Sequence, residues 1–195
     1  MARKPLAEPN DAQHPQSRRA AAFEAAALPH LGAAYTLARY LARRQDAAED
    51  IVQEAMLRAF RAFDGQRVDN LRAWLLAIVR NCFLTSIARG ARQDLEEASE
   101  SLKEDQIGGR DLDTPESILI KRQESAAIRV LIEDLPHHYR EVLVLRDIED
   151  MSYREIAEIT GVPIGTVMSR LARARKMFAG AWAGTGHAAA KETLP

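Results

Sequence analysis

Residues 151–178 constrain the fold of this chain more than any other stretch. Ser152 is followed three residues later by Glu155, a capping-box pattern that predicts the start of a helix. Gly161 and Pro163 then predict a tight turn, because glycine readily adopts a left-handed backbone and proline suits the first turn of a helix. We therefore expect two short helices joined at this turn, a helix-turn-helix.

The second of these helices, which begins near Ile164, has two chemically different sides. One is an apolar stripe with the helical period of about 3.6 residues: Ile164, Val167, Leu171, Ala174 and Phe178. The other carries small, hydroxyl and basic residues: Gly165, Thr166, Ser169, Arg173 and Lys176, with Arg170 on the flank. Such a face suits the DNA major groove, because small residues let the backbone approach base edges and the polar groups donate to bases and phosphates. The alternative is an ordinary helical hairpin whose arginines are merely solvated.

Composition neither supports nor excludes nucleic-acid binding. The 195 residues suit one or two small domains, and 27 Lys and Arg against 28 Asp and Glu give a formal net charge of -1. The local distribution of charge matters more, because salt screens attraction to phosphate beyond about 10 Å. The one cysteine, Cys82, excludes an intrachain disulfide and any zinc site built from several cysteines.

The sequence contains no pattern typical of an enzyme or of a membrane protein. It has no Gly-rich phosphate loop, no nucleophile elbow and no His-Glu-x-x-His motif, and the adjacent His137 and His138 would face different ways on a helix. We expect no enzymatic activity, no metal and no cofactor. No run approaches the roughly 20 apolar residues of a membrane span, and no signal peptide is apparent, so we expect a cytoplasmic protein without membrane insertion.

Helical periodicity along the whole chain predicts an all-α fold of two small domains. We expect a disordered tail over residues 1–17, a helical domain over 18–92, a flexible linker over 93–113, a second helical domain over 114–179 and a tail over 180–195. The linker is acidic and contains Gly108 and Gly109. It is either a plain spacer or an acidic strand that mimics nucleic acid and occupies a basic channel.

The first domain offers two polar surfaces. Residues 46–63 predict an amphipathic helix whose outer face, with Asp50, Gln53 and Glu54, is either solvated or a docking site for a partner helix. Residues 70–89 predict a second amphipathic helix, capped by Asn70 after a loop, with a basic polar side. No carboxylate lies between Asn70 and Arg92.

Three segments in this order resemble a bacterial sigma factor of the extracytoplasmic-function (ECF) group of the sigma-70 family, which keeps only the second and fourth conserved regions. They are AEDIVQEAMLRAFRAF (residues 48–63), NLRAWLLAIVRN (70–81) and LPHHYREVLVLRDIEDMSYREIAEITGVPIGTVMSRLARAR (135–175). The resemblance implies a transcription initiation factor that binds the β and β′ subunits of core RNA polymerase and directs it to promoter DNA. It also implies an anti-sigma factor that covers the same surfaces.

The resemblance assigns three groups of residues. Those implied to bind core polymerase are Asp50, Gln53 and Glu54. Those implied at the -10 element, including a loop that captures a flipped-out base, are Asp64, Gln66, Arg67, Asn70, Arg80, Asn81, Thr85 and Arg89. Those implied at the -35 element are Arg146, Thr166, Ser169, Arg170, Arg173 and Lys176.

Some positions depart from the family pattern. Thr85 stands where Asp or Asn is frequent, and Met168 replaces a basic residue found in some members, which leaves the promoter sequence open. The main alternative function is a conventional helix-turn-helix repressor or activator that acts without forming a holoenzyme. It would need a dimerisation element, and the sequence has no heptad seam. A third possibility is an adaptor whose basic helix contacts an acidic protein.

Overall fold

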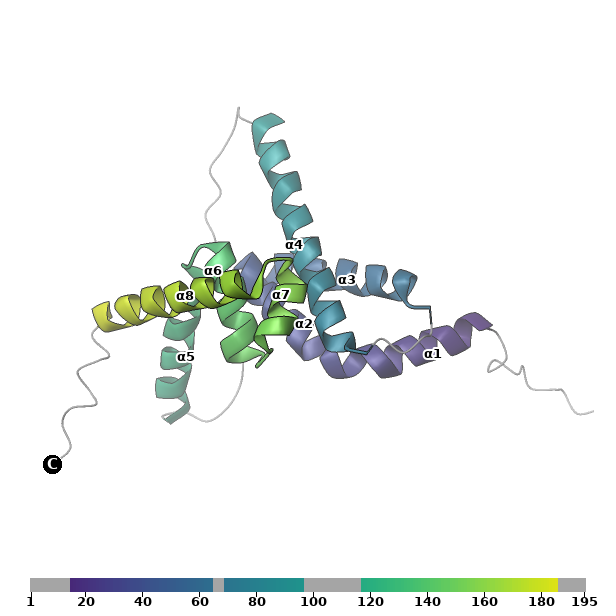
Figure 1. Cartoon of the computed structure of the whole chain (residues 1–195), viewed down its shortest axis with the longest axis horizontal. Helices are drawn as coiled ribbons and strands as arrows, with labels where there is room; N and C mark the ends of the chain where they lie inside the picture. The colour runs from purple at the N-terminus through teal and green to yellow at the C-terminus, as the bar shows by residue number, and fades with distance from the viewer. Residues whose placement is uncertain (1–14, 65–68, 97–116, 186–195) are drawn as a thin grey trace, which may run out of the picture.

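The computed structural model describes residues 15–64, 69–96 and 117–185, and within these ranges every regular element is helical (Figure 1). The elements are α1 (Pro15–Ala27), η2 (Leu28–His30), α2 (Leu31–Ala42), α3 (Gln45–Ala62), α4 (Leu71–Glu96), α5 (Ser117–Glu133), α6 (His137–Leu143), η3 (Val144–Ile148), α7 (Tyr153–Thr160) and α8 (Ile164–Gly184). The predicted all-α fold is therefore confirmed.

The first domain is built on α2, α3 and α4, which pack against one another. Leu37, Leu75 and Val79 are almost wholly buried between them, and each such side chain contributes roughly 1.5–3 kcal/mol by leaving water. Helix α1 is held to the end of α3, where Arg19 donates to the backbone oxygen of Phe63 at 2.7 Å. Phe23 packs edge-on against Phe63 beside this bond.

The second domain packs α6, η3 and α7 against α8, with α5 alongside. Its core includes Leu145, Ile156 and Val167, all fully buried. The predicted capping box is present, because the Glu155 amide donates to the Ser152 hydroxyl oxygen and the Ser152 amide donates to the Glu155 carboxylate. Gly161 ends α7 with φ 69°, the left-handed conformation that the turn requires.

Helix α4 is the longest element and projects beyond the body of the molecule at its C-terminal end (Figure 1). By length and composition its Leu71–Gly90 segment could cross a membrane, with mean hydropathy 1.3, so the prediction that no stretch is this long and apolar is wrong. Its hydropathy has another cause. Leu75, Leu76 and Val79 are at most 1% exposed, because α4 is the core helix of the first domain.

Several element ends differ from expectation. Helix α1 begins at Pro15, inside the predicted tail, and α4 runs to Glu96, inside the predicted linker, whose other residues lie outside the described ranges. Good helix formers after Gly90 allow that continuation. Helix α3 begins at Gln45, one residue before the predicted range, and Arg44 at its N-cap position makes no side-chain cap bond. Ile164, the first residue of the predicted apolar stripe, is 46% exposed at the start of α8.

Candidate nucleic-acid and polymerase interfaces

The outer face of α8 is open to solvent. Ser169, Arg173 and Lys176 are exposed, and Thr166 is half-buried beside them. The Ser169 hydroxyl donates to the Thr166 backbone oxygen at 3.0 Å, which leaves its oxygen free to accept. Within the described ranges no ion pair involves Arg173 or Lys176, so both cations are available to an anionic ligand. The residues predicted to face the groove therefore lie on the solvent-exposed side of α8.

Arg146 stands in the π-helical segment η3, next to the start of α7. Its guanidinium donates to the backbone oxygen of Met151 at 2.8 Å and lies 5.4 Å from the centre of the Tyr153 ring. It also pairs with the exposed carboxylate of Asp150 at 3.3 Å. These contacts hold the guanidinium near the N-terminal end of the helix-turn-helix.

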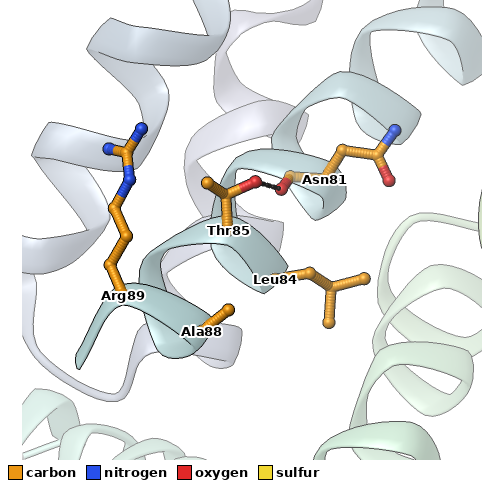
Figure 2. Close-up of a pocket in the computed structure, with 5 residues that line it drawn as sticks. All are labelled: Asn81, Leu84, Thr85, Ala88 and Arg89. Carbon is orange, nitrogen blue, oxygen red and sulfur yellow. Dashed lines mark hydrogen bonds between the residues drawn. The ribbon is translucent and has the colours of Figure 1, made fainter. Parts of the chain in front are cut away.

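Three of the predicted -10 residues, Asn81, Thr85 and Arg89, lie in the middle of α4. Asn81, Leu84, Thr85, Ala88 and Arg89 line a shallow hollow of about 480 Å³. Figure 2 shows the Asn81 amide and the Arg89 guanidinium pointing to opposite sides of the helix. The Thr85 hydroxyl donates to the Asn81 backbone oxygen at 2.8 Å, so its orientation is set by its own helix. The Asn81 amide and the Arg89 guanidinium can each donate to an unpaired base or a phosphate, from different sides of the helix.

A second hollow lies between α3 and α4 and joins the predicted polymerase surface to Arg89. Asp50 and Gln53 are exposed on α3, and Glu54 is half-buried. Arg58 donates to the Glu54 carboxylate at 2.6 Å, and this bond holds the pKa of Glu54 below its ordinary value. Glu54 therefore presents a negative charge at neutral pH. Burial at the floor of the hollow raises the pKa of the Cys82 thiol, which keeps it a neutral packing residue.

The remaining predicted -10 residues are placed differently. Asn70 caps α4, because its side-chain oxygen accepts from the Ala73 amide at 3.0 Å. Its side-chain nitrogen donates to Glu155 at 2.6 Å. Asp64 is exposed, whereas Gln66 and Arg67 lie outside the described residues.

Two predicted DNA-contacting arginines share one carboxylate. Arg80 donates to Glu141 of α6 at 2.8 Å, and Arg170 of α8 lies 3.5 Å from the other oxygen of the same carboxylate. Glu141 is 1% exposed. Sequence reasoning missed Glu141, although a signal was present, since it follows Arg140 within a segment whose other members, Val142 to Leu145, are apolar. A charged pair in such a segment needs partners when it is buried.

Two family models match the chain. The model described as Sigma-70 region 2 matches residues 27–93, and the model described as Sigma-70, region 4 matches residues 125–178. The sigma-E factor of Haemophilus influenzae, an ECF RNA polymerase sigma factor, is 34% identical over 149 residues, covering 73% of this chain and 77% of the relative. This chain belongs to the ECF sigma factors of the sigma-70 family.

Two further proteins show the same family relationship to this chain. The ECF sigma factor SigE of Mycolicibacterium smegmatis is 34% identical over 149 residues, and the matched part spans 76% of this ECF sigma factor and 57% of the relative. The sigma factor RpoE of Bartonella quintana, solved in complex with the anti-sigma factor NepR, superposes with a TM-score of 0.66 at 27% identity, covering 80% of this chain and 93% of RpoE. Sigma factors are not enzymes: they direct RNA polymerase to promoters.

Proposed function

We propose that this ECF sigma factor binds core RNA polymerase in the cytoplasm and directs it to promoters by recognising two DNA elements. The observation that carries the proposal is that a chain matched by both family models has two exposed surfaces of different chemistry. The exposed Ser169, Arg173 and Lys176 of α8 suit duplex DNA, and the hollow around Asn81 and Arg89 of α4 suits opened strands.

For duplex recognition, α8 would enter the major groove at the -35 element, where each base pair presents a distinct set of donors and acceptors. Arg173 would read a base edge, and Lys176 and Arg146 would hold phosphates. Arg170 points back to Glu141, so its DNA contact requires that ion pair to rearrange.

For the opened strands, α4 and the loop before Asn70 would trap bases of the -10 element. Binding unpaired bases favours the melted state and shifts the population toward it. Asp50, Gln53 and Glu54 would contact polymerase on the neighbouring face of α3. Arg89 lines the same hollow as Asp50 and Glu54, which supports polymerase and DNA contacts close together on this domain.

An anti-sigma factor is a further proposed partner. The relative from Bartonella quintana was solved with one, and it shares the architecture of this chain. A protein inhibitor would cover the α3 or α4 surface and so block polymerase or DNA.

Run-off transcription with purified core polymerase tests the proposal. A sigma factor confers promoter-specific starts on the core enzyme. A conventional repressor or activator binds operator DNA by itself and adds no starts to the core enzyme, and an adaptor does neither. Unselective transcription after addition of the purified chain would overturn the proposal.

A further inference from the structure

The C-terminal end of α3 has no helix-ending motif of its own. The helix ends at Ala62, and the backbone oxygens of a last turn lack partners within the helix. Only the Ala59 oxygen is served locally, because it accepts from the Phe63 amide at 2.9 Å. Neither Phe63 nor Asp64 takes the left-handed backbone that commonly closes a helix. The other oxygens at this end of α3 therefore need donors from elsewhere in the chain.

Arg19 of α1 supplies those donors (Figure 1). Its guanidinium donates through Nε to the backbone oxygen of Phe63 at 2.7 Å. Through Nη2 it donates to the backbone oxygens of Phe60 at 2.9 Å and Arg61 at 3.0 Å. The C-terminal end of a helix carries partial negative charge, so a cation is favourable there. One side chain thus binds three backbone oxygens at the point where α3 stops.

Aromatic rings hold this arginine and its helix in place. The Arg19 guanidinium lies 5.3 Å from the centre of the Phe60 ring, a distance suited to cation–π attraction. Phe23, one turn further along α1, packs edge-on against Phe60 and Phe63, with ring centres 5.4 Å and 5.5 Å apart. Phe23 and Phe63 are 8% and 6% exposed. We therefore expect α1 and the end of α3 to move together.

The end of α3 is also where residues assigned to the -10 element begin. Asp64 follows Phe63 directly, and Asn70 at the other end of this loop is fixed as the cap of α4. Gaining or losing one residue at a helix end moves the departing chain by about 1.5 Å and turns it by about 100°. Recognition of a ligand tolerates a displacement of only about 0.5 Å. The residue at which α3 stops therefore decides where Asp64 lies.

We propose that Arg19 is a positioning residue for the -10 element, because it fixes the residue at which α3 ends. The inference rests on the proposed function for the role of Asp64 and its neighbours, whereas the contact between Arg19 and α3 does not. Arg19→Ala leaves three backbone oxygens without their charged donor, so the freed chain end must be ordered again when a base binds. We expect this variant to lose about tenfold in discrimination between a matched and a mismatched -10 element.

Holoenzyme made from the full chain and purified core polymerase gives the first readout. Run-off transcription is compared on two promoters that differ in one base of the -10 element. Arg61→Ala is the matched control, because it removes an exposed cation from the same end of α3 but keeps the backbone oxygen. Arg19→Lys keeps the cation with fewer donors and should show intermediate discrimination. A merely structural role of Arg19 would lower transcription from both promoters equally and leave their ratio unchanged.

Amide hydrogen exchange of the full chain without polymerase gives the second readout. The Phe63 amide should exchange about tenfold faster in Arg19→Ala than in Arg61→Ala, because the last turn of α3 opens more often. Equal exchange in these two variants, or an unchanged promoter ratio in Arg19→Ala, would overturn the proposal. Should circular dichroism show that Arg19→Ala misfolds, Arg19→Lys replaces it and the same two outcomes decide. If the wild-type holoenzyme itself does not distinguish the promoters, the proposed function fails and the positioning role with it, while faster exchange still establishes the contact.

Discussion

Arg80 of α4 donates through Nε to Glu141 of α6 at 2.8 Å, across 61 positions of the sequence. The bond joins a residue of the region 2 match to a residue of the region 4 match. Arg80, which the family resemblance assigned to DNA, is therefore engaged in a contact within the chain. We expect this bond to contribute to the stability of the folded chain.

Removing the Glu141 charge should destabilise the folded chain. Glu141→Gln leaves Arg80 and Arg170 without their shared anion, and we expect a loss of roughly 1.5–3 kcal/mol in the free energy of unfolding, the range for hydrogen bonds to charged groups. Urea denaturation measures it. Glu158→Gln, which removes an exposed charge from α7, should change stability by less than about 0.5 kcal/mol. Equal midpoints for the two variants would show that Glu141 contributes nothing to folding.

Ser152→Ala should weaken the helix-turn-helix and change its response to acid. Loss of the cap costs about 1 kcal/mol. The Ser152 hydrogen bonds hold the pKa of Glu155 below its ordinary value of 4.5. The stabilisation from ionised Glu155 is therefore present above pH 4.5 and is lost as the pH falls through the lower folded-state value.

The variant should raise the pKa of Glu155 toward 4.5, which NMR titration of the carboxyl carbon measures. Its stability should then depend less on pH in this acidic range. A pKa for Glu155 that is the same in both proteins would contradict the role given to the capping box.

Arg173→Ala should weaken use of the -35 element by roughly 1–3 kcal/mol, the value of one good base contact. Transcription from promoters with intact and altered -35 sequences measures this. Arg154→Ala is the control, because Arg154 is an exposed cation of α7 whose side chain is 84% accessible. If Arg173→Ala still discriminates fully between the two promoters, Arg173 does not read the -35 element.

Changing Gln53 and Glu54 together to alanine should lower the affinity for core polymerase while duplex -35 DNA binding by the full chain is retained. The physical reason is loss of the ionised Glu54 carboxylate and its neighbour from the α3 surface. A pull-down with core polymerase gives the comparison, and Glu24→Gln on exposed α1 is the control. Retention of wild-type affinity by the double variant would place the polymerase contact elsewhere.

Local signals in the sequence were enough for several details of the structure. The Ser152 cap, the Gly161 turn and the Asn70 cap were predicted and are confirmed, because each depends on residues within a few positions. Helix ends were less predictable, as α4 shows, because nothing local stops a helix after Gly90 when good helix formers follow.

The sequence by itself determined the helices, their caps and the apolar stripe of α8, since these depend on local backbone preferences and on side-chain periodicity. Tertiary structure alone decided the long-range partners of Glu141, Glu149 and Arg140, which lie dozens of residues away in the chain. A charged residue in a sequence carries no mark of the partner it will meet. Whether Arg80 faces solvent or a buried carboxylate depends on how two helical domains pack, and that packing sums many contacts that no single segment contains.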